Sequence, residues 1–162
     1  MMRNTETAAA ATLTRATWIA RVAVLIVFLL NVSCALIFIA QPLQSATAYG
    51  LAATEENGAL VAGLGVAFLM WNVTYPLVIL NPARHQSLFA VVLAQQLTGL
   101  LGESFILLRL CSAGLANGLM AHGIIRFIVF DGGGLVLMLV AFLLLRHALK
   151  AARRNSGQTA LA

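Results

Sequence analysis

Long apolar runs separated by short polar stretches dominate the pattern of hydrophobic and polar positions along this chain. There are four such runs, at residues 22–40, 58–80, 88–108 and 127–145. An α-helix of about 20 apolar residues spans the roughly 30 Å hydrocarbon core of a bilayer, so each run is about long enough to cross it. Lipid offers the backbone no hydrogen-bond partners, and each run must therefore be helical throughout. The pattern predicts an all-α protein, a transmembrane four-helix bundle.

The spacing of the runs also predicts how the chain is organised. We expect one transmembrane domain over residues 17–150, flanked by frayed cytoplasmic tails at 1–16 and 151–162. The predicted helices cover about 18–40, 58–80, 87–109 and 123–149. The first run holds 19 residues. It exceeds the apolar core of about 7–15 residues in a signal peptide, so we expect it to be retained as a helix.

Three features predict local structure between and within the helices. Residues 41–57 form a longer loop, and the mixture of apolar and polar residues over 42–53 is typical of a short helix at the membrane interface. The connection at 81–86 begins with Asn-Pro, which stops a helix. Pro76 lacks a backbone N–H, and we expect it to bend the last turn of the second helix.

Composition supports the membrane assignment independently. The chain is 61% hydrophobic and only 9% charged, whereas a soluble domain carries about 25% charged residues. A formal net charge of +5 would suggest nucleic-acid binding in a soluble protein. The basic residues lie mostly at the ends of the apolar runs, however, and no basic patch has aromatic residues interleaved. We therefore expect the lipid bilayer, and not nucleic acid, as a partner.

Basic residues are distributed unequally between the two ends of the predicted helices. Eight lie at the end that carries both termini and the 81–86 connection, and two lie at the other end. The eight are Arg3, Arg15, Arg21, Arg84, Arg146, Lys150, Arg153 and Arg154, and the two are Arg109 and Arg126. Cytoplasmic loops of membrane proteins carry the excess of Lys and Arg. We therefore expect both termini in the cytoplasm and the short interfacial helix in the first extracytoplasmic loop.

Ionisable and amide side chains inside the predicted spans are the candidate functional residues. A charged group at the centre of a membrane helix costs about 2.5–3.5 kcal/mol, so its presence needs a reason. Glu103 lies about five residues, or roughly 8 Å, inside the outer end of its helix. Asp131 lies at a similar depth and Arg126 nearer the same boundary, so we expect an ion pair between Glu103 and Arg126. The predicted cluster comprises Asn31, Asn72, Gln95, Gln96, Glu103, Arg126 and Asp131.

Two interpretations of this cluster remain open from the sequence. In the first, its members form a satisfied hydrogen-bond network that fixes the order and register of the helices. In the second, they line an outward-facing polar pocket that binds a small ligand or relays protons, with Glu103 or Asp131 titrating.

Signatures of catalysis and of cofactor or metal binding are missing from the sequence. It contains no His-Glu-x-x-His, Cys-x-x-Cys, phosphate-binding loop or Gly-x-Ser-x-Gly motif. The three histidines lie at helix ends on different levels, and the two cysteines have no metal-ligand spacing. We expect no cofactor and no metal, and the sequence favours a non-enzymatic protein without deciding the matter.

The layout of helices and polar positions resembles a known group of membrane proteins. The stretch Ala48-Tyr49-Gly50-Leu51 follows the first helix, and polar positions recur inside the later helices at Asn72, Gln95, Gln96 and Glu103. In these features, over about residues 18–150, the chain resembles small bacterial four-helix membrane proteins of the DoxX-like and BphX-like kind. The resemblance implies a bacterial inner-membrane protein, and it assigns no functional residue.

The functional hypothesis from the sequence is a non-enzymatic scaffold or accessory subunit, because four helices leave little room for a translocation path. Its partners would be the bilayer and either a second copy of the chain, in a homo-oligomer, or another membrane protein. The alternative hypothesis is a small proton-coupled carrier or ligand-binding membrane protein that uses Glu103 and Asp131.

Reporter proteins fused to the C-terminus test the predicted topology. A reporter that works only in the cytoplasm should be active there, and one that works only in the periplasm should be silent, because basic residues gather at this end. An active periplasmic reporter at the C-terminus would contradict the prediction.

Overall fold

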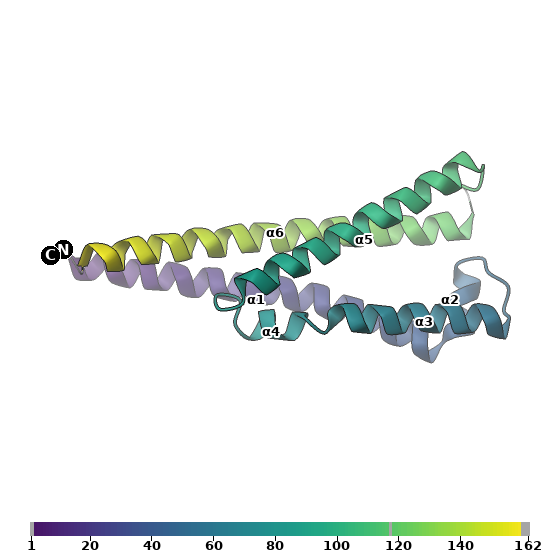
Figure 1. Ribbon diagram of the computed structural model, residues 1–162, viewed down its shortest axis with the longest axis horizontal. Helices are drawn as coiled ribbons and strands as arrows, with labels where there is room; N and C mark the ends of the chain where they lie inside the picture. Colours follow the sequence, from purple (N-terminus) through teal and green to yellow (C-terminus); the bar gives the residue numbers. More distant parts are fainter. Residues whose placement is uncertain (1, 117, 160–162) are drawn as a thin grey trace.

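The computed structural model describes residues 2–116 and 118–159, and it describes the side chains of residues 10–116 and 118–154. Within these residues, all regular secondary structure is helical (Figure 1). The helices are α1 (Met2–Ala40), α2 (Pro42–Ala48), α3 (Glu55–Asn72), α4 (Tyr75–Leu80), α5 (Gln86–Ser112) and α6 (Leu119–Thr159). Four segments are long and apolar enough to cross a membrane, namely Ala10–Ala40, Glu55–Leu80, Gln86–Ser112 and Leu119–Arg154. The predicted all-helical class, with four segments long and apolar enough to cross a membrane, is confirmed.

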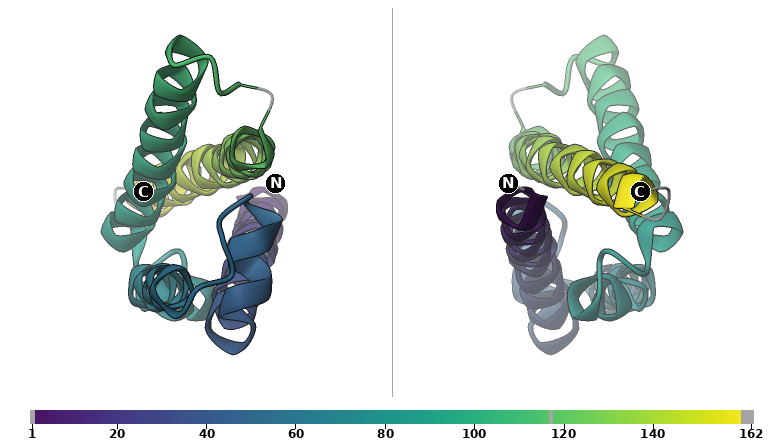
Figure 2. Two further views of the ribbon diagram at one scale, coloured as in Figure 1. Left: turned by 90° about the vertical axis from the view of Figure 1, so that its right-hand side faces the viewer. Right: turned by 90° about the vertical axis from the view of Figure 1, so that its left-hand side faces the viewer.

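The long helices α1 and α6 run antiparallel and bring both ends of the chain to the same end of the molecule (Figures 1 and 2). Viewed along the long axis, α3 with α4, and α5, complete a ring of helices around a common centre (Figure 2). α1 packs against α6, α3 and α4, and α5 packs mainly against α6. The four crossing segments are therefore held chiefly through α1 and α6.

The two segments that were predicted to be frayed tails continue the long helices α1 and α6. α1 is helical from Met2 and α6 through Thr159, beyond the level at which α4 turns into α5 (Figure 1). These segments are rich in alanine, a strong helix former. Ala16 and Ala148 are buried in the seam between the two helices. Residues 1 and 160–162, the remainder of the predicted tails, lie outside the described residues.

Capping and turn residues explain where the internal helices begin and end. The short helix α2 lies in the long first loop, where the sequence predicted a short helix. It starts at a proline, whose missing N–H leaves no unpaired donor in the first turn. α3 starts at Glu55, earlier than predicted, because the Thr54 side chain accepts a hydrogen bond from the Asn57 amide. The Asn81 side chain accepts one from the Arg84 amide at 3.1 Å, which shapes the turn before α5.

The second membrane segment is interrupted, whereas the sequence predicted only a bend in its last turn. α3 ends at Asn72 and α4 begins at Tyr75, with the Val73 amide donating to the carbonyl of Met70. Pro76 accounts for the break, because its nitrogen cannot donate to the carbonyl of Asn72 and its ring crowds the preceding turn. The location of the disturbance was therefore predicted and its extent was not.

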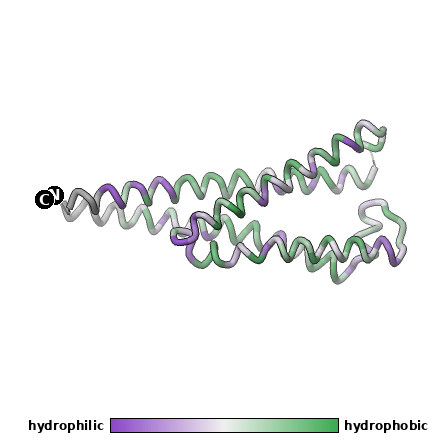
Figure 3. The backbone as a smooth tube through the Cα atoms, in the orientation of Figure 1, coloured by the Kyte–Doolittle hydropathy of each residue, from purple (hydrophilic) through white to green (hydrophobic). Residues whose placement is uncertain are grey.

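Two apolar clusters lie on either side of a polar layer. The larger joins residues of α1, α4, α5 and α6, and Tyr75, Phe89 and Met138 are fully buried in it. The smaller joins α1, α2 and α3 around Phe38 and Val61. Along α1, Asn31 lies between the residues that belong to the larger cluster and the residues that belong to the smaller cluster. Many Leu, Ile and Val side chains are exposed, and hydrophobic residues (green) run along all the long helices (Figure 3). An apolar surface of this kind suits a lipid environment.

Arg21 links the first helix to the end of α4. Its Nη2 donates a hydrogen bond of 2.6 Å to the carbonyl of Leu80, the last residue of α4. The guanidinium also lies 5.3 Å from the centroid of the Trp18 ring. A positive charge at the carboxyl end of a helix is favourable, because the last carbonyls there lack partners. Arg21 therefore holds the short helix against α1.

At Gly65 the backbones of α3 and α1 approach each other closely. A Cβ atom at this position would lie 2.8 Å from the carbonyl oxygen of Ala35 and 2.9 Å from Cγ1 of Ile39. Helices in lipid associate through small residues that let their backbones approach, because the hydrophobic effect does not drive the contact there. Two positions earlier, a Cβ at Gly63 would meet nothing within 4 Å.

Replacing Gly65 with alanine should therefore destabilise the bundle. Gly65→Ala should lower the free energy of unfolding by about 1–3 kcal/mol, the usual cost of overpacking, as measured by denaturant unfolding in detergent micelles. Gly63→Ala is the matched control and should leave that free energy unchanged or raise it by up to about 1 kcal/mol. Equal stabilities for the two variants would show that the crossing is looser than the structure indicates.

Candidate functional site

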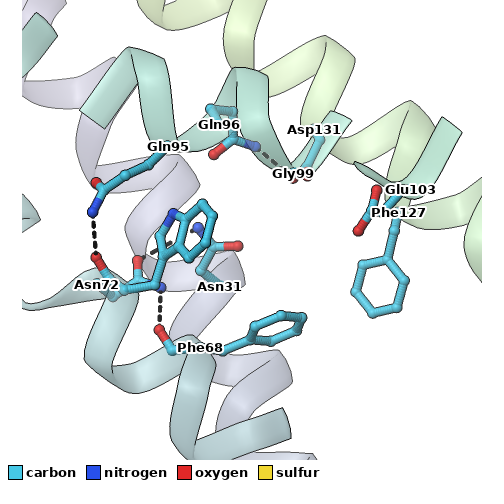
Figure 4. Close-up of a pocket in the computed structure, with 10 residues that line it drawn as sticks. Asn31, Phe68, Asn72, Gln95, Gln96, Gly99, Glu103, Phe127 and Asp131 are labelled. Atoms are coloured by element: carbon cyan, nitrogen blue, oxygen red, sulfur yellow. Dashed lines mark hydrogen bonds between the residues drawn. The ribbon is translucent and has the colours of Figure 1, made fainter. Parts of the chain in front are cut away.

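All four membrane-crossing segments contribute to one cavity in the polar layer (Figure 4). The cavity has a volume of about 120 Å³. It is lined by Asn31, Phe68, Trp71, Asn72, Gln95, Gln96, Gly99, Glu103, Phe127 and Asp131. Every member of the predicted polar cluster except Arg126 is among them. The sequence therefore identified the polar lining, and the structure adds the aromatic part.

Gln96 is the centre of the hydrogen-bond network beside the cavity. Its Nε2 donates a 2.6 Å hydrogen bond to Oδ1 of Asp131, and its Oε1 accepts one of 3.2 Å from the hydroxyl of Tyr75. The side chain is buried, and only 3% of the residue is exposed. A buried amide is stabilising only when its donor and acceptor are both paired, as they are in this network. Gln96 thus ties α4, α5 and α6 together at one level.

Gln95 stabilises the interruption between α3 and α4. Its Oε1 accepts a hydrogen bond of 3.2 Å from the hydroxyl of Thr74, and its Nε2 donates one of 3.3 Å to the carbonyl of Trp71. A broken helix inside a membrane leaves backbone carbonyls without partners, and neighbouring side chains must supply donors. Gln95 does this from α5, so the break and the polar residue opposite it belong together.

The two asparagines connect α1 to α3. Nδ2 of Asn31 donates to Oδ1 of Asn72 at 3.4 Å, and Nδ2 of Asn72 donates to the carbonyl of Phe68 at 2.8 Å. Asn72 is 4% exposed, whereas Asn31 is half-buried. The long distance between the asparagines leaves Asn31 weakly bound, with an amide at the edge of the cavity.

Glu103 is the member of the cluster whose bonding is incomplete. Its Oε2 is buried and has no hydrogen-bond partner among the described residues. The predicted ion pair with Arg126 is wrong, because no salt bridge joins these two described residues and Arg126 is exposed. Arg126 precedes Asp131 by five residues, which places the two side chains about 140° apart around α6. When Asp131 faces the cavity, Arg126 therefore points elsewhere, and it lines a neighbouring cavity instead.

Gly99 lets Asp131 come close to the backbone of α5. A Cβ atom at Gly99 would collide with Oδ2 of Asp131. Gly102, one turn further along, has open space around it. The glycine that belongs to the site is therefore Gly99, whereas Gly102 is exposed and outside it.

The aromatic residues that line the cavity were not predicted from the sequence to belong to the site. Phe68 and Trp71 line the cavity and are three residues apart, which is a spacing of one helix face, and Tyr75, whose hydroxyl bonds to Gln96, follows four residues later. Asn72 belongs to the same face, so this spacing is the signal that could have identified them. Phe127, from α6, carries no such local signal, and only its position in the folded chain places it at the cavity.

Comparison with protein families, curated proteins and solved structures gives no match to this chain. The resemblance to DoxX-like and BphX-like proteins stays a prediction. Among the described residues, no three His, Cys, Asp or Glu side chains are grouped so as to hold a metal ion. Two carboxylates, four amides and three aromatic rings are thus the chemistry that this cavity offers.

Removing the Gln96 amide should destabilise the bundle. In Gln96→Leu the hydroxyl of Tyr75 and the carboxylate of Asp131 both lose a partner, at about 1–3 kcal/mol for each buried group left unsatisfied. Denaturant unfolding in detergent measures the loss. Ser104→Ala is the control, because this exposed hydroxyl on the same helix bonds only to the carbonyl of Leu100. A Gln96→Leu protein as stable as the control would mean that the network contributes nothing.

Proposed function

We propose that this membrane protein binds a compact cation in the polar cavity. Of the two functional hypotheses, ligand binding is favoured over a purely structural network, because the polar cluster surrounds a cavity and does not close on itself. Glu103 and Asp131 give the cavity its acidic groups, and no basic side chain lines it among the described residues. If the protein also transports this cation, the same two carboxylates would couple its transport to protons.

The buried oxygen of Glu103 is the observation that carries the proposal. A polar atom buried in an apolar medium without a partner costs free energy, and a carboxylate costs more than a neutral group. Its neighbour Asp131 already bonds to Gln96, so the cluster satisfies one carboxylate and leaves the other open. A cation or a proton at Glu103 would remove that cost.

The aromatic rings and the size of the cavity narrow the class of ligand. Phe68, Trp71 and Phe127 line the cavity together with the two carboxylates, and the Phe127 ring lies beside Glu103 (Figure 4). The faces of such rings attract ammonium groups. A volume of about 120 Å³ is several times the roughly 30 Å³ that a water molecule occupies in the liquid. A small ammonium ion such as methylammonium therefore matches both the charge and the space.

A second candidate, the scaffold or accessory subunit, has one observation in its favour. The outer part of α5 leans away from the other helices (Figure 1), and Leu101, Phe105 and Leu108 are more than half exposed on it. Lipid covers such a face in a membrane, and another membrane protein or a second copy of the chain would cover it equally well. Ligand binding remains the first proposal, because the cavity contains an unpaired carboxylate oxygen.

The location that we propose is a bacterial inner membrane with both termini in the cytoplasm. The excess of basic residues at the shared end of α1 and α6 supports this orientation. In it, α2 lies at the outer interface and the cavity lies nearer the outer surface. The resemblance to DoxX-like and BphX-like proteins supports the bacterial assignment.

The fluorescence of Trp71 provides a direct test of cation binding. The chain contains two tryptophans, so Trp18→Phe leaves Trp71, at the wall of the cavity, as the only one. Titration of this variant with methylammonium chloride should give a saturable change in emission, measured against sodium chloride at equal ionic strength. Adding Glu103→Gln should weaken binding about tenfold or more, because a hydrogen bond to a charged group is lost.

Glu55→Gln is the matched control, because Glu55 is exposed at the start of α3. This variant should bind methylammonium as the parent does. The proposal would be overturned if methylammonium did not change the Trp71 emission, or if it changed the emission of the Glu103→Gln protein as much as that of the parent.

A further inference from the structure

A second, larger cavity adjoins the polar one. It has a volume of about 540 Å³ and lies between α1, α2 and the beginning of α6. Its lining includes Leu30, Cys34, Ile37, Tyr49, Arg126 and Phe130. Its walls are mostly apolar, and Arg126 is the one cation among these residues. Its chemistry is thus the reverse of that of the polar cavity, which contains carboxylates and no cation.

The larger cavity is bordered by side chains that face the bilayer. Leu30 and Ile37 are each 52% exposed, and Ser33 is also exposed. All three lie within the membrane-crossing segment Ala10–Ala40, so the medium outside them is lipid and not water. A molecule that enters the cavity between these residues therefore comes from the membrane. Its apolar part is kept out of water both in the lipid and in the cavity, so it has the favourable free energy of burial in both.

The two cavities meet at Asn31 and Phe127, which line both. The Phe127 ring stacks on Tyr49 with 6.2 Å between centroids and meets Phe68 edge-on at 5.9 Å. Tyr49 belongs to the larger cavity and Phe68 to the polar one. Phe127 is thus the partition between them, and the half-buried Asn31 is the polar edge beside it.

The charges of Arg126 in the larger cavity and Glu103 in the polar cavity both affect the pKa of Tyr49. Burial is the largest effect on its phenol and raises the pKa. The charge of Arg126 lowers this pKa, and the charge of Glu103 raises it. Arg126 and Glu103 therefore both act on Tyr49, from the two sides of the Phe127 partition. A ligand that spans the partition meets a cation on one side and a carboxylate on the other.

We propose that the two cavities together bind one membrane lipid whose headgroup carries a phosphate and a primary ammonium, as in phosphatidylethanolamine. This inference rests on the proposed function, since it places the ammonium at Glu103 in the polar cavity. Arg126 contacts the phosphate, and an acyl chain lies along the apolar wall formed by Leu30, Ile37 and Phe130. A primary ammonium offers three donors, which suits the unpaired oxygen of Glu103.

This assignment follows from matching charge and access. A guanidinium pairs well with phosphate oxygens, and an exposed arginine at the edge of a membrane segment lies where lipid phosphates are found. An anionic lipid without an amine would satisfy Arg126 and leave Glu103 unpaired. A simple alkylamine would satisfy Glu103 and leave Arg126 without an anion. Only the zwitterion satisfies both.

Alkylation of Cys34 reports whether the larger cavity is filled. Cys34 lines this cavity, and Cys111→Ser makes it the only thiol in the full chain. This variant is placed in nanodiscs of phosphatidylglycerol alone or of phosphatidylglycerol mixed equally with phosphatidylethanolamine. N-ethylmaleimide should react with Cys34 about tenfold more slowly in the mixed discs. One added hydrogen bond between charged groups strengthens lipid binding in the cavity by about that factor.

Three variants in this background complete the test. Arg126→Gln and Glu103→Gln should each abolish the protection that phosphatidylethanolamine gives, and Arg109→Gln, an exposed arginine at the end of α5, should retain it. Equal reaction rates in the two membranes, or protection that survives either Arg126→Gln or Glu103→Gln, would overturn the lipid assignment. If Trp71 still responds to methylammonium in that case, only this inference fails. If Trp71 does not respond either, the proposed function fails with it.

Discussion

The hydrogen bonds of one buried amide hold this bundle in register. Gln96 accepts from Tyr75 and donates to Asp131, so it joins α4, α5 and α6 at a single level inside the bundle, where lipid could not satisfy these groups. Apolar side chains by themselves would allow the helices to slide or rotate, because Leu and Val pack almost equally well against lipid and against each other. The two apolar clusters lie on either side of this layer and follow the positions that it sets.

The same layer explains why a break in the second membrane segment is tolerated. Pro76 interrupts the helix, and Gln95 of α5 donates to the carbonyl of Trp71 next to the gap. Irregular backbone at membrane depth survives only where protein or a polar cavity surrounds it. Trp71 and Asn72, next to the interruption, both line the cavity, so the structural disturbance and the candidate site lie side by side.

The candidate site arises where this network stops short of completion. Asp131 is paired and Glu103 is not, although both line the same small cavity. A fully satisfied layer would serve structure alone, whereas an unpaired buried oxygen beside a cavity raises the affinity for any group that can donate to it. Phe127 and Asn31 connect this cavity to a larger one next to the bilayer, and Arg126 places the opposite charge there.

Hydropathy alone was sufficient to identify the four membrane segments, because burial in lipid depends on the local run of apolar residues and on nothing distant. The same local argument selected Asn31, Asn72, Gln95, Gln96, Glu103 and Asp131, since a polar side chain in such a run is costly wherever the helix lies. Which of them bond to one another depends on how each helix is rotated about its axis, and apolar runs carry little information on rotation. The tertiary structure therefore decided that Gln96 pairs with Asp131, that Arg126 turns away from Glu103, and that Phe127 separates two cavities. Contacts between side chains far apart in sequence decide these points, and no single segment contains them.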